Sequence, residues 1–214
     1  PPPHGDDTRL WGPPFVGGVA TYFHSINRGK KSLGLNLKTE GGKRILWQLI
    51  ERADVLLENF RPGVLSGLGF GYDEMAPRNP RLIYCSVSGF GQTGPYRGRP
   101  GYDVVAQGEG GLMDLTGYPD QPPAKVGTSI SDIVTGMYAF QGILLALLSR
   151  HRSNKGQLID VSLLDSTVST LTYQSLIYLT TGKAPGRMGT RHPSIVPYEC
   201  FEVKDGFVNI GVTN

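Results

Sequence analysis

The pattern of apolar and polar positions predicts strands and helices that alternate along most of the chain. Ile45, Leu46, Leu49 and Ile50 fall on one face of a helix, which is flanked by two short apolar segments. A strand, a helix and a second strand in this order are typical of a parallel sheet. The pattern predicts strands at residues 32–37, 54–59, 81–88 and 157–163.

The most regular helical pattern covers residues 131–152. Ser131 is the predicted N-cap, Asp132 lies in the first turn, and two arginines and a histidine lie in the last turn. Two further helices are predicted at residues 102–117, with fraying at the glycines, and at residues 165–182. The predicted strands and helices together indicate a layered α/β domain.

The composition changes after residue 182. Glycine, arginine and proline dominate up to residue 192, which predicts a linker, and the segment that follows predicts a hairpin turning at residues 204–206. We therefore predict an α/β fold with a doubly wound, mostly parallel, Rossmann-like sheet in residues 1–182. Residues 183–214 are predicted to be a linker and the first hairpin of a smaller α+β domain. Because the chain lacks an initiator methionine and stops inside a predicted strand, we expect a piece of a longer protein.

Composition and charge narrow the class of protein. The chain is 39% hydrophobic and 18% charged, with a formal net charge of +3, as is usual for a globular domain. No basic stripe alternates with aromatic residues, so we predict no nucleic-acid partner. The longest apolar run, residues 139–148, is shorter than a membrane span, so we predict no membrane.

The cysteines and histidines indicate neither a disulfide nor a metal site. Cys85 and Cys200 lie far apart in predicted strands, which favours reduced core residues. We therefore expect a cytoplasmic protein, or a protein of the mitochondrial matrix if the source is eukaryotic. The four histidines are scattered, without the spacing of metal ligands, so we predict no metal site.

Residues 89–94, GFGQTG, have the spacing of a dinucleotide-binding loop. That loop works only if its third glycine opens a helix whose amides hold the pyrophosphate. Here Gly94 is followed by PYRGRPG, which is unsuited to starting a helix. We therefore predict no nicotinamide or flavin site, and instead a glycine-rich loop that lets the backbone approach another group closely.

Asp132 is the carboxylate with the most suggestive surroundings. The small residues around it leave space for a ligand, and a helix N-terminus keeps a carboxylate ionised, as a nucleophile must be. The alternative is that Asp132 only offsets the helix dipole, which many first-turn carboxylates do. Asp103, taken alone, is predicted to cap its own helix. The residues by themselves leave these alternatives open.

Seven blocks of the sequence, taken together, are specific. The blocks are GDDTRLWGPPF, NRGKKSLGLNLKTEGG, DVLLENFRPGVLSGLGFGY, NPRLIYCSVSGFGQTGPY, PGYDVVAQGEGGLM, SDIVTGMYAFQGILLALLSRHRSNKGQLIDVSLLDS and GTRHPSIVPYECF. They closely resemble one family, the class III CoA-transferases, which include formyl-CoA, carnitinyl-CoA and succinyl-CoA:dicarboxylate transferases. The resemblance covers nearly the whole chain.

The resemblance implies a reaction and a nucleophile. Asp132 matches the carboxylate that attacks the acyl-CoA donor, which gives a mixed anhydride and then an aspartyl-CoA thioester. Coenzyme A is transferred from the donor to a small free carboxylic acid, and the overall similarity leans toward dicarboxylate-type substrates such as succinyl-CoA. No bound cofactor is implied, since the CoA thioester is a substrate. The family also forms interlocked dimers, so a homodimer is implied.

The resemblance also implies substrate contacts. Two features depart from the family. Gly67 stands about where some relatives carry a basic residue. The family's first strand and its closing glycine-rich loop would lie outside residues 1–214. We therefore expect this piece not to be a competent enzyme by itself. The positions that match CoA-binding positions of the family are Leu35, Asn36, Leu37, Lys38, Asn59, Phe60, Arg61, Gly101, Tyr102 and Asp103.

Two alternatives remain from the sequence. An α-methylacyl-CoA racemase of the same superfamily pairs a histidine with the aspartate of the long helix, but Tyr102 stands at the histidine position and is a poor base at neutral pH. The other alternative is a non-catalytic CoA-binding or interaction fragment.

Overall fold

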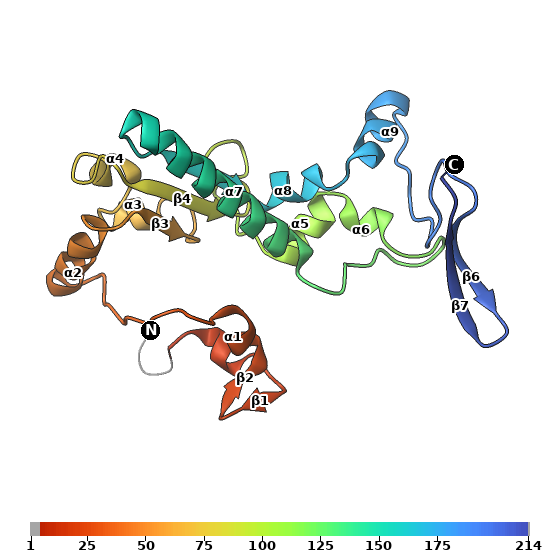
Figure 1. The fold of residues 1–214 in the computed structure, drawn as a ribbon, viewed down its shortest axis with the longest axis horizontal. Coiled ribbons are helices and arrows are strands. Elements are labelled where there is room, and N and C mark those ends of the chain that lie inside the picture. The colour runs from red at the N-terminus through yellow and green to blue at the C-terminus, as the bar shows by residue number, and fades with distance from the viewer. Residues whose placement is uncertain (1–4, 214) are drawn as a thin grey trace. The chain divides into compact units, whose positions relative to one another are not determined.

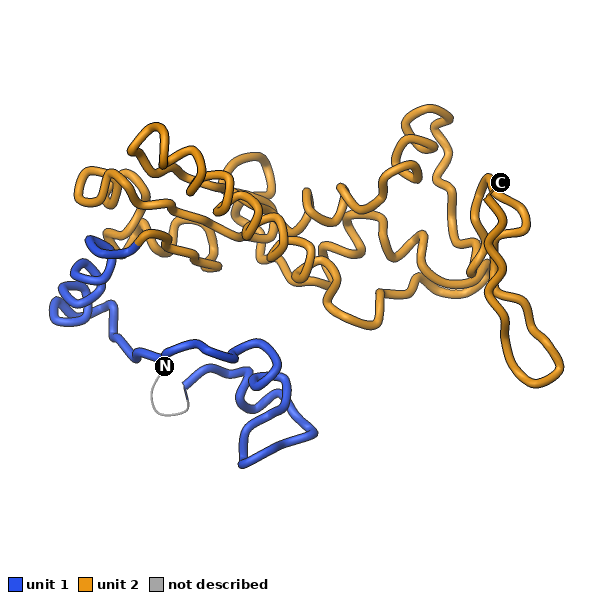
Figure 2. The backbone as a smooth tube through the Cα atoms, viewed as in Figure 1, with its two compact units in different colours: residues 1–53 blue, residues 54–214 orange. Residues whose placement is uncertain are grey.

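The computed structural model describes residues 5–213, which form two compact units. The first unit comprises residues 1–53 and the second residues 54–214 (Figure 2). Residues 1–4, which begin the predicted domain 1–182, and residue 214, which ends the predicted domain 183–214, lie outside the described residues. The predicted division near residue 182 stays a prediction.

The first unit is built from short elements and one longer helix (Figure 1). The helix α2 begins after Thr39, whose side chain accepts a hydrogen bond from the Gly42 N–H at 3.2 Å. This is the usual way of satisfying an amide that the first turn leaves unpaired. The elements are η1 (Asp7–Leu10), β1 (Phe15–Val16), β2 (Val19–Ala20), α1 (Thr21–Ile26) and α2 (Glu40–Ile50).

The strand predicted at residues 32–37 is wrong. These residues, all described, form no strand, and the side chain of Leu33 is 63% exposed. Leucine alternates with small or polar residues there, which suits a strand, but a strand also needs a neighbour to pair with its backbone. No neighbouring strand is paired with this segment, so the alternation produces no sheet.

The second unit contains a parallel sheet of three strands in the order β3–β4–β5. The central strand β4 is buried, and Ile83 and Cys85 are fully inaccessible, as expected for a strand covered on both faces. The α/β fold with a parallel sheet is therefore confirmed. The strands are β3 (Val55–Glu58), β4 (Ile83–Ser88) and β5 (Leu158–Ser162).

The remaining elements of the second unit surround or follow this sheet (Figure 1). The predicted hairpin is confirmed, since β6 and β7 pair antiparallel. The elements are α3 (Val64–Gly67), α4 (Tyr72–Met75), α5 (Asp103–Glu109), α6 (Leu112–Leu115), α7 (Ile130–Ser153), α8 (Leu163–Ser169), α9 (Tyr173–Thr181), β6 (Tyr198–Val203) and β7 (Gly206–Gly211).

Two predicted helices are each divided into two. The break between α5 and α6 falls at Gly111, with φ of +82°, a conformation that glycine adopts without strain. The break between α8 and α9 falls at Thr172, with φ of +46°. The glycine pattern predicts the first break, whereas nothing in the sequence predicts that a β-branched residue would interrupt the second helix.

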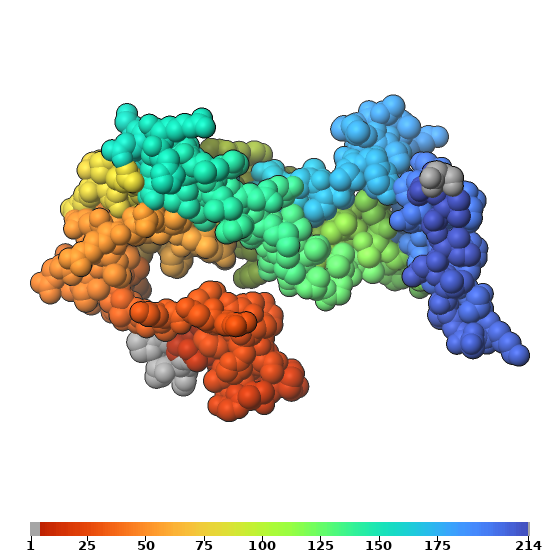
Figure 3. All heavy atoms as spheres, in the orientation of Figure 1, coloured from red at the N-terminus to blue at the C-terminus, as the bar shows by residue number. Residues whose placement is uncertain are grey.

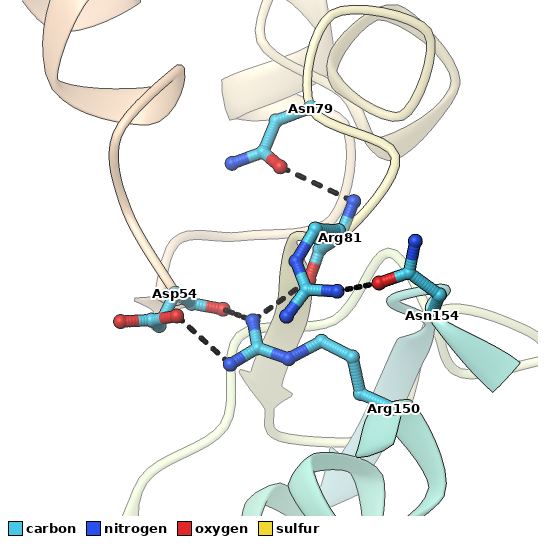
Figure 4. Close-up of polar contacts among 5 residues, drawn as sticks. All are labelled: Asp54, Asn79, Arg81, Arg150 and Asn154. Atoms are coloured by element: carbon cyan, nitrogen blue, oxygen red, sulfur yellow. Dashed lines mark hydrogen bonds and ion pairs between the residues drawn. The ribbon is translucent and has the colours of Figure 1, made fainter. Parts of the chain in front are cut away.

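The carboxyl end of α7 is tied to the start of the sheet by Arg150, which is only 9% exposed. Its guanidinium donates to the carboxylate of Asp54 at 2.8 Å and to the backbone carbonyl of Arg81 at 3.0 Å (Figure 4). Arg81 in turn donates to the Asn154 side chain just beyond the helix. Because Asp54 and Arg81 precede β3 and β4, this cluster fixes the helix against the sheet.

The opposite face of α7 is apolar and exposed. Its side chains at Ile133, Met137, Phe140, Leu144 and Leu148 recur at helical spacing along one stripe. Helix α7 lies open on the face shown in Figure 3.

By length and composition alone, α7 could cross a membrane. The sequence prediction considered only the apolar run at residues 139–148, which is shorter than this helix. The other face of α7 packs on β4, β5, α5 and α8, and it contains the buried Arg150. These contacts are those of a helix covering a sheet.

The loop after β4 touches its own chain closely at two glycines. A Cβ placed on Gly101 would lie 2.2 Å from the Cα of Gly89, and a Cβ on Gly89 would lie 2.5 Å from the Cα of Gly101. The backbone of the GFGQTG loop thus closely approaches Gly101, two residues before α5.

We expect Gly101→Ala to destabilise the protein, because backbone atoms on both sides would have to move. Overpacking of this kind costs roughly 1–3 kcal/mol. The matched control is Gly98→Ala in the same loop, where the new Cβ meets nothing within 4 Å and the free energy of unfolding should change by less than about 0.5 kcal/mol. Denaturant unfolding of the full-length protein measures both, and equal stabilities would contradict the contact.

Candidate active site

The carboxyl ends of the three parallel strands lead into a predicted CoA contact, the GFGQTG loop and a helix. Asn59 follows β3, Gly89 follows β4, and α8 follows β5. The Asn59 side chain donates to the Val87 carbonyl at 2.8 Å, and the Leu164 N–H donates to the Gly89 carbonyl at 3.1 Å. In open α/β sheets, ligands bind beyond this edge.

The GFGQTG loop is held to the sheet by its own polar atoms. The Gly91 N–H donates to Ser88 Oγ at 3.0 Å, and the Gln92 N–H donates to Asp160 Oδ2 at 2.9 Å. The Gln92 side-chain amide donates to Ser86 Oγ at 2.7 Å. These two backbone amides are therefore already bonded within the chain, and no helix starts at Gly94, in agreement with the sequence prediction.

The polar groups below the loop have a structural role. The Ser86 hydroxyl donates to the buried carboxylate of Glu58, which also accepts the Phe60 N–H at 2.8 Å. Burial, followed by the negative charges of Glu58 and Asp160, raises the pKa of the Cys85 thiol to about 11. A buried, protonated thiol is a poor nucleophile.

The predicted contacts Leu35–Lys38 lie in the first unit, immediately before α2. The Asn36 side chain accepts the Lys38 N–H at 3.0 Å, and the Asn36 carbonyl accepts the Thr39 hydroxyl at 2.9 Å. The same carbonyl leaves no room for a side chain at Gly42, since a Cβ there would lie 2.1 Å away. Leu35 and Leu37 are half-buried beside this turn.

The predicted contacts after β3 and before α5 lie in the second unit. Asn59 is bonded to β4, whereas the side chains of Phe60 and Arg61 are exposed. Tyr102 is 66% exposed and precedes the first residue of α5. Tyr102 and Arg61 are therefore accessible to a ligand, while Asn59 also holds two strands together.

Asp103 caps a helix other than its own. Its Oδ1 accepts the backbone N–H of Ser131, in the first turn of α7, at 2.9 Å. The sequence predicted that Ser131 would be the N-cap of the long helix and that Asp103 would cap α5. Both expectations are wrong, because α7 already begins at Ile130 and α5 has no side-chain cap.

A chain of buried polar side chains supports this contact. The amide of Gln107, fully buried, donates to Asp103 Oδ2 at 2.7 Å and accepts the Val126 N–H at 2.8 Å. On the other side, the hydroxyls of Ser131 and Thr167 lie 2.7 Å apart and link α7 to α8. Gln107 and Thr167 carry no signal in the sequence that sets them apart, since each is one of several polar residues in its helix.

Asp132 lies next to this chain but outside it. None of the described residues forms a hydrogen bond or ion pair with its carboxylate, and its side chain is exposed. Surrounding atoms still desolvate it, and this burial, followed by the negative charge of Asp103, raises the pKa of Asp132 above its ordinary value. Burial and Asp103 thus act against the stabilisation of the ionised form that is expected at a helix N-terminus.

One cavity among the described residues lies elsewhere in the second unit. Its volume is about 350 Å³, and its lining comes mainly from α6, α8, α9 and the turn between α8 and α9, including Leu115, Leu171 and Tyr178. Its wall is mostly apolar and includes neither Asp103 nor Asp132.

Asp132 is thus an exposed carboxylate without a bonded partner, on a helix end that Asp103 caps. Such a carboxylate suits nucleophilic attack. No group of three metal-binding side chains occurs among residues 5–213.

Known proteins resemble this chain over its whole length. The model of CoA-transferase family III matches residues 1–214. An acetyl-CoA:oxalate CoA-transferase of Acetobacter aceti is 52% identical over 96% of this chain and 53% of its own length. A succinyl-CoA:glutarate CoA-transferase of Mus musculus is 47% identical over 100% of this chain and 49% of its own. The chain thus spans about half the length of the curated relatives it matches.

Solved structures agree with these matches. A CAIB/BAIF family protein from Brucella suis superposes with a TM-score of 0.89 and 49% identity, over 96% of this chain and 55% of its own. A protein from Mycobacterium tuberculosis superposes with a TM-score of 0.84 and 33% identity, over 98% of this chain and 55% of its own. The sequence resemblance is therefore confirmed, and the chain belongs to CoA-transferase family III.

Proposed function

We propose that the full-length protein transfers coenzyme A from an acyl-CoA donor to a free carboxylic acid, with Asp132 as the nucleophile. The proposal rests on the surroundings of the Asp132 carboxylate in a chain of this family. Asp132 is an exposed carboxylate without a bonded partner, on a helix end that Asp103 holds in place. An exposed carboxylate without a bonded partner can reach a substrate, and Asp103 rather than Asp132 caps this helix end.

The proposed reaction proceeds by covalent catalysis. The Asp132 carboxylate attacks the carbonyl carbon of the donor thioester, the C–S bond breaks, and CoA leaves as a thiolate. The thiolate then attacks the Asp132 carbonyl of the mixed anhydride, which releases the donor acid and forms an aspartyl thioester. The acceptor carboxylate attacks this thioester, which expels CoA as a thiolate and forms a second mixed anhydride. The thiolate then attacks the acceptor carbonyl of that anhydride, which gives the new acyl-CoA and frees the Asp132 carboxylate. Each step is an acyl transfer at an activated carbonyl.

The substrates proposed are a CoA thioester and a small dicarboxylate. The names of two similar proteins specify oxalate and glutarate as acceptors, and we infer an acceptor of the same class here. Arg61 and Tyr102, both exposed, are available to the substrate, and Leu35–Lys38 are proposed to contact the nucleotide part of CoA. We propose no bound cofactor, since CoA arrives and leaves with the substrates.

The proposed setting is a cytoplasmic homodimer without a membrane or nucleic-acid partner. Both cysteines are free thiols in the structure, and Cys85 is buried, which suits a reducing compartment. The division into a large domain up to residue 182 and a smaller one after it belongs to the same proposal.

Replacing the nucleophile tests the function. In the full-length protein, Asp132→Asn should lower the transfer rate at least about 10³-fold, because amide nitrogen and oxygen cannot replace an attacking carboxylate. Asp73→Asn, which also removes an exposed first-turn carboxylate, should leave the rate within about twofold. The measurement is CoA transfer from succinyl-CoA to oxalate or glutarate. A rate in Asp132→Asn equal to wild type would refute the role.

The raised pKa of Asp132 predicts how stability depends on pH. A carboxyl group whose pKa is raised on folding binds its proton more tightly in the folded state. Its contribution is therefore fully present below the unfolded pKa and is lost as the pH rises through the folded pKa. The difference in Tm between Asp132→Asn and wild type should thus increase as the pH rises through this acid range. At neutral pH the Tm of the variant should stay slightly higher than that of wild type. A Tm difference that shrinks with rising pH would show that the sign is wrong.

Exchange of the α-proton separates a transferase from a racemase. A racemase must remove that proton, whereas every step proposed here takes place at the carbonyl carbon. We expect the full-length protein to incorporate less than about one deuteron per 10² transfers when it turns over a 2-methylacyl-CoA in D₂O. Mass spectrometry of the recovered thioester measures this, and exchange as fast as transfer would favour the racemase.

A further inference from the structure

We propose that Gln107 is a positioning residue, which holds the Asp103 carboxylate against the first turn of α7 and so sets the orientation and surroundings of Asp132. The inference rests on the proposed function for its catalytic consequence. Its structural part, the coupling of Gln107 to Asp132 through Asp103, can be tested without any turnover.

The direction of the Gln107 amide is fixed by its partners. The Val126 backbone N–H can only donate, so the amide oxygen must face Val126, at 2.8 Å. The amide nitrogen must then face Asp103, and it lies 2.7 Å from Oδ2. Asp103 Oδ1 is occupied by the Ser131 N–H at 2.9 Å. Both carboxylate oxygens are therefore held, and the carboxylate is fixed in one rotation.

Simple core packing does not require an amide at position 107. The side chain is fully buried, and an apolar residue of similar size would fill the same space without polar atoms to satisfy. Both bonds of the amide lead toward the catalytic end of α7, one through Asp103 and one to the loop before that helix. The oxygen and nitrogen of the Gln107 amide thus lie where they can orient the residues around the start of α7, as a positioning residue must.

The other acidic groups on elements around α7 are engaged elsewhere. On β5, Asp160 accepts the Gln92 N–H, and on α8, Asp165 bonds with Ser162. On α5, Glu109 pairs with Arg99. Asp103 is the group whose negative charge raises the pKa of Asp132. A change at Gln107 should therefore reach Asp132 through Asp103.

Two substitutions separate positioning from packing. Gln107→Met keeps the volume but removes the donor to Asp103. Gln107→Glu keeps the shape, and its carboxyl group, while protonated, can still donate to Asp103 and accept the Val126 N–H. Once that group ionises, two carboxylates face each other and repel. Gln141→Glu, at an exposed position on α7, is the matched control for an added charge.

The kinetic test is the ratio of kcat, variant over wild type, measured against pH in the full-length protein. We expect Gln107→Met to lower kcat about 10- to 100-fold at all pH values, with KM for acyl-CoA within about twofold. For Gln107→Glu the ratio should approach one at acidic pH and fall to the Met value as the pH rises. For Gln141→Glu it should stay near one throughout. A ratio for Gln107→Glu that does not change with pH would overturn the inference.

A second readout needs no catalysis. The ¹³C signal of the Asp132 carboxyl group, assigned by its loss in Asp132→Asn, reports its titration directly. In Gln107→Met the Asp103 carboxylate keeps the Ser131 N–H but is no longer fixed in one rotation, so its effect on Asp132 should weaken and the pKa of Asp132 should fall toward its ordinary value. An unchanged titration in the folded variant would contradict the coupling. If the wild-type protein transferred no CoA, the proposed function would fail while this titration still decided the role of Gln107.

Discussion

The hydrogen bond from the Ser131 N–H to the Asp103 carboxylate is the contact on which the site depends. It satisfies one of the amides that the first turn of α7 leaves unpaired, and it fixes that turn to α5. The same contact brings a negative charge toward Asp132, whose own carboxylate stays unbonded and exposed. One interaction thus holds the helix end and places the acidic groups of Asp103 and Asp132, the proposed nucleophile, near each other.

Helix α7 can carry such a site because both of its ends are held. At the far end, the buried guanidinium of Arg150 joins the helix to the residues before β3 and β4. At the near end, Asp103 and the Ser131–Thr167 contact join it to α5 and α8. The sheet and the helix therefore support the residue proposed as the nucleophile, and a group positioned in this way loses little entropy when substrate arrives.

Much of the fold could be predicted from the sequence, because it depends on local periodicity. The long helix, the three parallel strands and the hairpin were recognised in this way, and the residue types of the blocks identified the family. What the sequence could not show depends on distant partners. The strand predicted at residues 32–37 lacks a neighbour, and the capping of α7 by Asp103 joins residues 28 positions apart. The direction of the pKa shift of Asp132 likewise depends on burial and on the distant Asp103, which the residues beside Asp132 in the sequence do not reveal.

The most direct test of the account is to trap the intermediate on Asp132. Full-length protein would be incubated with acyl-CoA and treated with hydroxylamine or borohydride, and the modified residue would be located by peptide mass spectrometry. The account predicts a hydroxamate or a reduced alcohol at Asp132, formed only when acyl-CoA is present. Transfer that proceeds at full rate while Asp132 remains unmodified, or a modification found at another residue, would contradict it.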